Sequence, residues 1–307
     1  MITNFNTDML LFICMADAYA LAAEYLKENE HADHIENIKK YTGYQQHPKH
    51  LQVPGTFSDD GEMSCAVASV LLNHNYPFTK EQFADAFVAE FIRGGKRRGY
   101  SRGFQSVLDE CETGSDLLEK VSGTSEKNGA CMRAVPLGVI PDIHNMLDTA
   151  TLQASITHNT APAIFSAKAV GLMSRFSLYT NDSFSKMGEF CVEFLDPEER
   201  DDYAHIFREP WQGRVVGSDV TPVSITTVHA VHHLLTNCNS LMEIMNAIID
   251  FGGDTDSVAA IAWGIASARY KYENIPGFMR SCLEPSSINT GEAYLMSLGS
   301  RLMLKYG

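Results

Sequence analysis

The sequence predicts an all-α protein, one compact domain of many helices that spans residues 1–307. Apolar residues recur at helical spacing through most of the chain, and the nearest approach to an alternating β pattern is "GRVVGSDV", residues 213–220. With 307 residues, 45% of them hydrophobic, the chain can bury one large core, and we find no repeat, low-complexity tract or long linker that would divide it. We therefore expect function to be carried on the loops between helices.

Helix start and stop signals place the individual elements. A helix capped by Asp8 is expected to run to about residue 27. Thr79 and Gln82 form a capping-box pattern for a helix over residues 79–93. Further helices are expected after Ser58 and over residues 103–112, 130–139, 141–159, 161–179, 223–237, 241–251 and 258–272.

Composition excludes several classes of function. A formal net charge of −14 makes the chain a poor candidate for binding nucleic acid or an anionic membrane, although local donors could still hold a small anion. No stretch approaches the ~20 apolar residues that cross a bilayer. The apolar run after Met9 lacks the basic start of a signal peptide. Seven scattered cysteines without a CxxC pair indicate reduced thiols. We therefore expect a cytoplasmic monomer without a membrane partner.

Two acidic clusters are the first candidates for chemistry. Asp59 and Asp60 are adjacent in "GTFSDDGEM", with no basic residue within six positions on either side. A second cluster, "GGDTDS", places Asp254, Asp256 and Ser257 just before a strongly apolar helical run. Each cluster begins a predicted helix, so one interpretation is that these side chains cap the helices. Capping uses one acid for each helix and leaves the other carboxylates without a role.

The alternative interpretation is a divalent cation. Four carboxylates and the hydroxyls of Ser58 and Ser257 are hard oxygen ligands, which select Mg²⁺ or Mn²⁺ over zinc. Gly252 and Gly253 would let the backbone turn closely around such a centre. The two clusters lie far apart in the sequence, so only the fold can bring them together. Spacing alone leaves caps and metal ligands both open.

A histidine cluster offers a competing metal site. His229, His232 and His233 stand at i, i+3 and i+4, a spacing that could ligate zinc from one helical face. The motif itself includes no carboxylate or cysteine partner that would complete such a site. We interpret these histidines as a polar patch on a core helix.

Five further blocks accompany the acidic motifs in a fixed order along the chain. They are "ADAYALAAE" (16–24), "RRGYSRGF" (97–104), "NGACMRAVPLG" (128–138), "SITHNTAPAI" (155–164) and "NIPGF" (274–278). With "SDDGEM" and "GGDTDS", this order resembles the ADP-ribosylglycohydrolases, the family of dinitrogenase-reductase-activating glycohydrolase. The family motifs read Thr/Ser-Asp-Asp-Thr-x-Met and Gly-Gly-Asp-Thr-Asp-Thr/Ser. The family's first glutamate falls seven residues after an aspartate, as Glu24 does after Asp17.

The resemblance implies an all-α fold with two divalent metal ions, Mg²⁺ or Mn²⁺, in a central cleft. It places metal ligation on Ser58, Asp59, Asp60, Asp254, Asp256 and Ser257. It also implies that Glu24 lies beside the metals as a gate or proton-transfer group. The residues expected to line an ADP-ribose cleft are Ser125, Asn128, Gly129 and His158.

The activity that the resemblance implies is hydrolysis of the bond between C1″ of ADP-ribose and a modified protein or other acceptor. Such a centre reacts through an oxocarbenium-like state, and two divalent ions can orient the sugar and activate water. Catalytic roles would fall on Glu24, Asp59, Asp60 and Asp256. Backbone N–H groups near Asn128 are expected to take the pyrophosphate. The alternative is a catalytically weak ADP-ribose-binding or immunity protein that counters an ADP-ribosyltransferase by contact.

The sequence departs from the family pattern at several places; Ala16 and Lys271 each replace a family glycine and are interpreted as packing changes, and two departures lie in the site motifs. Gly61 stands where the first acidic motif usually has Thr, at a position that is not a ligand in the family motif. Glu126 and Lys127 precede Asn128, where the family usually has a small or aromatic residue followed by Gly. Because that loop is expected to meet the ADP moiety, we expect an altered substrate preference.

Overall fold

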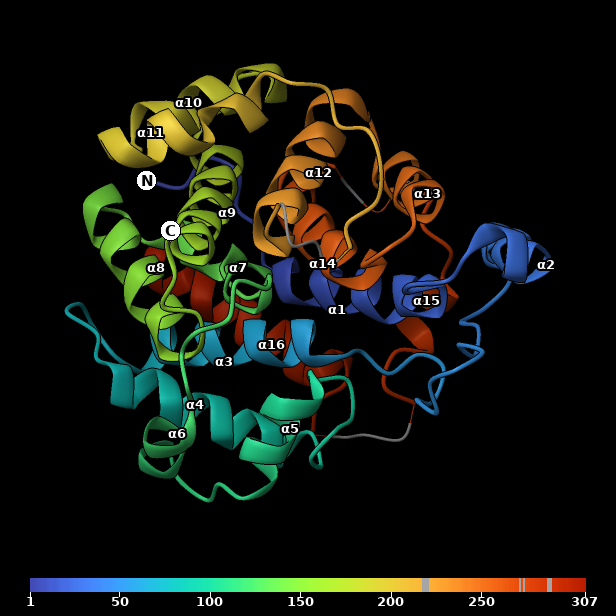
Figure 1. Ribbon diagram of the computed structural model, residues 1–307, viewed down its shortest axis with the longest axis horizontal. Coiled ribbons are helices and arrows are strands. Elements are labelled where there is room, and N and C mark those ends of the chain that lie inside the picture. Colours follow the sequence, from blue (N-terminus) through green and yellow to red (C-terminus); the bar gives the residue numbers. More distant parts are fainter. Residues whose placement is uncertain (217–220, 271, 273, 286–288) are drawn as a thin grey trace.

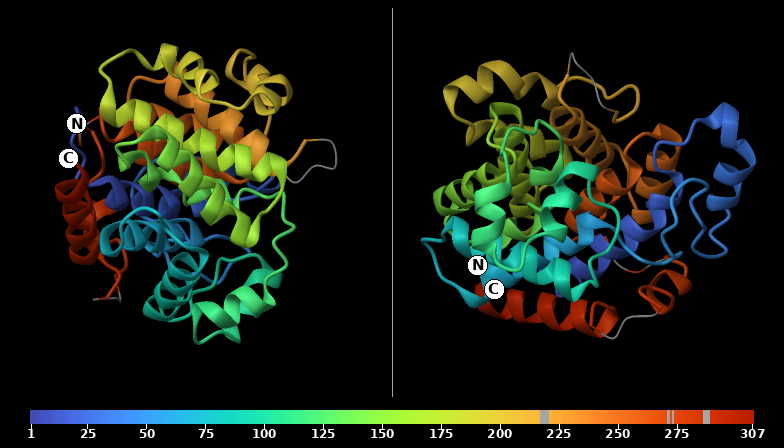
Figure 2. Two further views of the ribbon diagram at one scale, coloured as in Figure 1. Left: turned by 90° about the vertical axis from the view of Figure 1, so that its left-hand side faces the viewer. Right: turned by 60° about the horizontal axis from the view of Figure 1, so that its bottom comes forward.

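The computed structural model describes residues 1–216, 221–270, 272, 274–285 and 289–307. The described chain is helical, and its helices pack in layers around a central pair (Figures 1 and 2). Within the described ranges there is no β-strand; the only β pairing consists of isolated bridges between Thr124 and His158 and between Val215 and Gly253. The all-α prediction is therefore confirmed.

The helices follow the chain in this order. In the first half they are α1 (Met9–Ala20), α2 (Glu28–Ile38), α3 (Asp59–Asn73), α4 (Lys80–Arg93), α5 (Arg102–Asp109), α6 (Gly114–Lys120), α7 (Gly129–Met132) and α8 (Ile143–Thr157). In the second half they are α9 (Ala161–Tyr179), α10 (Met187–Glu193), α11 (Pro197–Tyr203), α12 (Val223–Asn237), α13 (Leu241–Phe251), α14 (Thr255–Ala266), α15 (Phe278–Ser281) and α16 (Glu292–Tyr306). Short 3₁₀ turns occupy Leu21–Ala23, Val135–Val139, Phe184–Lys186 and Ala204–Phe207.

Helices α1 and α14 form the centre of the molecule. Every residue of both helices is buried, as expected for helices that are apolar on all sides. Helices α3 and α16 pack against α1, and α9 and α12 pack against α14, so the pair lies between two groups of helices (Figure 1). Among the described residues, no helix has both the length and the apolar character needed to cross a bilayer.

Several helix predictions are confirmed at their ends. Helices α9, α12 and α13 begin and end where the sequence pattern placed them. Helix α3 begins at Asp59 with Ser58 at its N-cap. Helix α4 has the expected capping box, in which the Thr79 hydroxyl accepts from the Gln82 backbone N–H and the Gln82 side chain bonds back. The starts of α3, α4 and α13 were predictable because their capping side chains, Ser58, Thr79 and Ser240, are local.

Other predictions were wrong in extent. The first helix ends at Ala20 instead of near residue 27, and the Asp8 side chain accepts a hydrogen bond from Tyr272 (2.8 Å) instead of capping it. The segment 130–139 divides into α7 and a 3₁₀ turn, because Pro136 cannot occupy a helix interior. The last apolar run is helical over Thr255–Ala266. Residues 217–220 of the expected β pattern lie outside the described residues.

Candidate active site

A cavity of about 550 Å³ lies at the N-termini of α3 and α14. Asp59 and Asp60 reach it from α3, and Asp254, Asp256 and Ser257 reach it from the start of α14. The volume is typical of small-molecule sites, which measure roughly 300–1,000 Å³. The fold thus brings the two acidic clusters, which are far apart in the sequence, to one cavity.

The first acidic turn is held by Asp17, a buried residue of α1. Both Asp17 carboxylate oxygens accept from the Ser58 backbone N–H at 2.9 Å, and Oδ2 also accepts from the Gly61 N–H at 2.9 Å. Burial raises the pKa of Asp17 to about 6, and these hydrogen bonds oppose the rise. Asp17 therefore accepts hydrogen bonds from backbone N–H groups at the start of α3, a capping role that the sequence analysis considered only for Asp59 and Asp60. The sequence analysis missed this role, for which the signal was an aspartate inside an apolar helix.

Ser58 and Asp60 lie against each other at the start of α3. The Ser58 hydroxyl donates to Asp60 Oδ2 (3.1 Å) and accepts from the Asp60 backbone N–H (3.3 Å). Ser58 is buried and is not among the residues that line the cavity, unlike the other five predicted ligands. Burial, and then the charges of Asp17 and Asp59, raise the pKa of Asp60 well above its usual range.

The second acidic turn depends on close backbone packing. Gly252 and Gly253 adopt φ angles of 62° and 81°, which favour glycine. The Asp254 N–H donates to the Val215 carbonyl at 2.7 Å. A Cβ atom on Gly253 would lie 2.3 Å from the Val215 carbonyl oxygen, so a larger residue cannot enter without a shift of the backbone. The close turn expected from the glycine pair is present.

Glu24 joins the second acidic turn. Potential ligand atoms of Glu24, Asp254 and Asp256 all lie within 4.8 Å of one another. Glu24 reaches this position because α1 ends early and the chain turns at Tyr25, which has φ 49°. Burial, and then the negative charges of Asp254 and Asp59, raise the pKa of Glu24 to about 8. Among the described residues, the basic group nearest to this cluster in an ion pair is His50, whose Nε2 lies 3.8 Å from Glu24 Oε2.

The donor set fits a divalent cation. Asp60 Oδ1 and Asp256 Oδ1 are buried and have no hydrogen-bond partner among the described residues. A buried acceptor without a donor is destabilising, and an ionised one more so. The surrounding ligand atoms are carboxylate and hydroxyl oxygens, which Mg²⁺ and Mn²⁺ prefer. By contrast, His229, His232 and His233 do not line this cavity, and no group of potential metal ligands in the described chain includes them.

Comparison with known proteins shows the family of the chain. The family model for ADP-ribosylglycohydrolase matches residues 7–306. The chain belongs to the ADP-ribosylglycohydrolase family. An uncharacterized protein of Archaeoglobus fulgidus is 25% identical over 289 residues, which cover 85% of this chain and 86% of that protein. A solved structure described as an ADP-ribosylglycohydrolase-related protein complex has a TM-score of 0.70 at 19% identity, with 98% of this chain and 97% of that chain covered. The family predicted from the motifs is therefore confirmed.

The four residues predicted to bind substrate all line the same cavity: Ser125, Asn128, Gly129 and His158. Asn128 Nδ2 donates to Asp254 Oδ2 at 3.0 Å, so its side chain also supports the acidic turn. A Cβ atom on Gly129 would lie 2.7 Å from His158 Cε1, so the histidine ring packs where only glycine leaves room. Burial lowers the pKa of His158 to about 3, which keeps the imidazole neutral at ordinary pH.

Of the described residues, three with cationic side chains also line the cavity, although the chain as a whole is acidic: Lys120, Lys127 and Arg133. Arg133 is 1% exposed, and its guanidinium donates to Gln153 Oε1 (2.5 Å) and Thr157 Oγ1 (2.9 Å). Burial lowers the pKa of Arg133 to about 9, so it remains charged near neutral pH. The sequence analysis missed Lys120 and Arg133, whose signals were weak because single basic residues are common.

The structure explains one departure from the family motif. A Cβ atom on Gly61 would lie 2.7 Å from Phe57 Cδ2 and 2.8 Å from Cys14 Sγ, so these side chains fill the space that Thr would need. At the second departure, Lys127 lines the cavity, whereas Glu126 does not. The carbonyl of Glu126 accepts a hydrogen bond from the backbone N–H of Ser224, at 3.4 Å.

Proposed function

We propose that this member of the family is a divalent-cation-dependent hydrolase that cleaves the glycosidic bond between ADP-ribose and a modified acceptor. The observation that carries the proposal is the pair of buried acceptors, Asp60 Oδ1 and Asp256 Oδ1, which lack hydrogen-bond donors within the described chain. They belong to separate turns that open on one cavity. The family acts on ADP-ribosylated substrates, which gives the class of substrate.

The two turns would share the task of holding two Mg²⁺ or Mn²⁺ ions. We assign ligation to the carboxylates of both turns and to the hydroxyl of Ser257, with Ser58 as a further predicted ligand. When bound, such ions orient sugar hydroxyls and lower the pKa of a water molecule. Burial raises the pKa of Glu24 to about 8, and its carboxyl group lies beside those of Asp254 and Asp256. We therefore assign Glu24 to proton transfer.

The remainder of the cavity supplies groups that suit ADP-ribose. The ammonium of Lys127 and the guanidinium of Arg133 offer positive charge to the pyrophosphate. Ser125 and His158 line the same cavity and offer polar atoms to the nucleoside. Because α7 is a single turn, we assign the pyrophosphate to these side chains in preference to a helix N-terminus. The change at Glu126 and Lys127 stays our predicted source of altered substrate preference.

Thermal melts test the metal site directly. The wild type and Asp60→Asn are each melted in EDTA and in millimolar Mg²⁺. Ligand binding stabilises a protein by about 2.7 kcal/mol at a hundredfold excess over Kd, so we expect Mg²⁺ to raise the wild-type Tm. Asp60→Asn replaces a buried carboxyl group whose ionised form is unfavourable without a cation, so we expect no loss of stability in EDTA and a smaller response to Mg²⁺.

Asp142→Asn is the matched control, because Asp142 caps α8 through the Asn145 N–H at 2.9 Å and does not line the cavity. Its response to Mg²⁺ should equal that of the wild type. Activity is then measured as release of ADP-ribose from arginine-linked, serine-linked and nucleic-acid-linked substrates, with and without Mg²⁺. Equal wild-type melting temperatures in EDTA and Mg²⁺ would refute the metal site. Metal binding without release from any substrate would favour the binding or immunity protein.

A further inference from the structure

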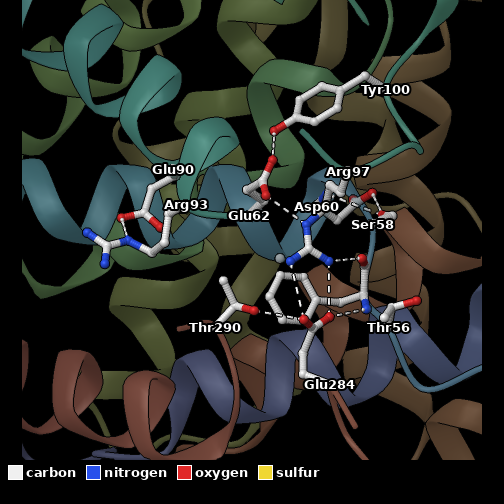
Figure 3. Close-up of polar contacts among 12 residues, drawn as sticks. Thr56, Ser58, Asp60, Glu62, Glu90, Arg93, Arg97, Tyr100, Glu284 and Thr290 are labelled. Carbon is white, nitrogen blue, oxygen red and sulfur yellow. Dashed lines mark hydrogen bonds and ion pairs between the residues drawn. The ribbon is translucent and has the colours of Figure 1, made fainter. Parts of the chain in front are cut away.

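A buried ion network lies beside the first acidic turn (Figure 3). The guanidinium of Arg97 lies between two carboxylates, with Nε 2.7 Å from Glu62 Oε1 and Nη1 3.0 Å from Glu284 Oε1. The three side chains are 8%, 2% and 3% exposed, respectively. The network thus joins the loop after α4 to the first turn of α3 and to the segment after α15.

The network contacts both sides of the acidic turn. On the N-terminal side, Arg97 Nη1 donates to the Phe57 carbonyl at 2.5 Å, and its guanidinium lies 4.0 Å from the centre of the Phe57 ring. Glu284 Oε1 accepts from the Phe57 backbone N–H at 3.2 Å. On the C-terminal side, the network ends on Glu62. Asp59 and Asp60 therefore lie between two fixed positions, residues 57 and 62.

Neighbouring groups complete the network. The Tyr100 hydroxyl donates to Glu62 Oε2 at 2.5 Å, and the Thr290 hydroxyl donates to Glu284 Oε2 at 2.7 Å. Gly99, between Arg97 and Tyr100, lines the cavity. A Cβ atom on Gly99 would lie 3.3 Å from Ser58 Cβ, so this loop rests directly on the acidic turn.

The chemistry of the network favours a role in geometry over a role in stability. Burying three charged groups carries a large desolvation penalty, so a buried ion network adds little net stability compared with apolar packing. A planar guanidinium, however, offers several donors in a fixed fork and can bond two carboxylates and a carbonyl at once. Lysine offers a single point charge and cannot reproduce that pattern.

We propose that Arg97 is a positioning residue for the cation site: it fixes the backbone at Phe57 and the side chain of Glu62, and thereby aims Asp59 and Asp60 into the cavity. This inference rests on the divalent-cation site of the proposed function. Arg97 itself does not line the cavity, so it acts through the turn and not on the substrate.

The test measures Mn²⁺ binding by the electron paramagnetic resonance of free Mn²⁺, at a temperature where circular dichroism shows each variant folded. In Arg97→Lys we expect Mn²⁺ affinity to fall about tenfold, as is usual when groups that orient metal ligands are lost. Tyr100→Phe removes one hydroxyl from the network and should fold readily; we expect a fall of about threefold. The KM for substrate should change less than kcat, because the substrate wall of the cavity is untouched.

Arg93→Lys is the matched control, because Arg93 Nε also pairs with a buried glutamate, Glu90, at 3.2 Å, in an ion pair that does not involve residues 57–62 (Figure 3). Its Mn²⁺ affinity should stay within about twofold of the wild type, whatever its Tm. An equal loss in Arg93→Lys, or unchanged affinity in both Arg97→Lys and Tyr100→Phe, would overturn the positioning role while leaving the proposed function intact. A wild type that binds no Mn²⁺ would overturn both.

Discussion

The two acidic turns of the cavity differ in the forces that hold them. The first, residues 57–62, is fixed mainly by charged groups: the Arg97 guanidinium with Glu62 and Glu284, and the carboxylate of Asp17 on two backbone N–H groups. A substitution that changes charge should therefore disturb this turn more than one that changes volume at its surface.

The second turn, residues 252–257, is fixed by neutral hydrogen-bond donors and by close packing, in which the Arg214 guanidinium lies against Gly252. Gly253 lies against the backbone of Val215, and the Thr255 hydroxyl donates to the Ala20 carbonyl at 2.8 Å. Tyr25 and Asn128 donate to the same oxygen of Asp254, each at 3.0 Å. No basic side chain forms an ion pair with this turn in the described chain. The comparison shows that the two acidic turns of one cavity can be held by different forces, one mainly by ion pairs and the other mainly by neutral donors and packing.

The largest expected effect concerns what both turns share, a surplus of negative charge. The pKa values of Glu24 and Asp59 are raised to about 8 and about 7, mainly by burial. Without metal, the folded protein therefore holds protons that the unfolded chain has lost by about pH 5. Its stability must fall as pH rises through the folded-state pKa values, by roughly 6 kcal/mol between about pH 5 and pH 8 when the two groups are added. Urea unfolding in EDTA across this range measures the fall.

Two further measurements sharpen this prediction. Saturating Mg²⁺ should remove most of the pH dependence, because a bound cation favours the ionised carboxylates. Glu24→Gln removes one carboxyl group whose pKa is raised. The stability of this variant in EDTA should therefore fall less steeply with pH than that of the wild type. A wild-type stability in EDTA that is flat or rises over this range would contradict the prediction.

The next prediction concerns added volume in the second turn, residues 252–257. In Gly253→Ala, the new methyl group would lie 2.3 Å from the Val215 carbonyl oxygen, at a residue with φ 81°. Steric overlap and backbone strain together should lower the free energy of unfolding by about 3 kcal/mol. Gly95→Ala is the matched control: its φ is 74°, but nothing lies within 4 Å, so only strain of about 1 kcal/mol is expected. Equal losses in urea unfolding would show that packing against Val215 is unimportant.

A smaller effect is expected when volume is added to the first turn, residues 57–62. In Gly61→Ala, the methyl group would lie 2.7 Å from Phe57 Cδ2, and the Phe57 ring must shift beneath the guanidinium of Arg97. We expect a loss of about 2 kcal/mol. Gly103→Ala, on α5 with nothing within 4 Å, should instead be neutral or stabilising by up to about 1 kcal/mol. If Gly61→Ala were stabilising, the Phe57 ring would have to move aside without lowering the free energy of unfolding.

The features that could be predicted from the sequence are local ones. The caps at Ser58 and Thr79 lie within three residues of the N–H groups they bond, so a short stretch of sequence contains the whole interaction. The acidic clusters are likewise contiguous, and their motifs carried the family. The structure shows that both clusters open on one cavity.

The features that could not be predicted depend on contacts between distant residues. Asp17 bonds a backbone group 41 residues away, and Arg97 pairs with a carboxylate 187 residues away. The early end of α1 has the same origin, because the Ala20 carbonyl accepts from Thr255 and the Tyr25 N–H donates to Gly253. Local periodicity favoured a longer helix, but these tertiary hydrogen bonds end it and direct Glu24 to the site.

The smallest effect concerns a single hydroxyl that bonds the second turn. Tyr25→Phe removes the hydrogen bond to Asp254 Oδ2, while Asn128 still donates to that oxygen. Because Tyr25 is 45% exposed, we expect a loss of at most about 1 kcal/mol in stability. Mn²⁺ affinity should nevertheless fall severalfold, since Asp254 can then rotate away from the direction that its two donors impose.

Tyr76→Phe provides the matched control for this last change. Tyr76 is 43% exposed, and its hydroxyl bonds Asp148 Oδ2 at 3.0 Å, the same length as the bond between Tyr25 and Asp254. The two substitutions thus remove similar tyrosine–aspartate hydrogen bonds, one at the cavity and one outside it. Only Tyr25→Phe should weaken Mn²⁺ binding. If both variants bind Mn²⁺ as the wild type does, Asn128 alone orients Asp254, and the second turn depends on backbone packing more than on its side-chain donors.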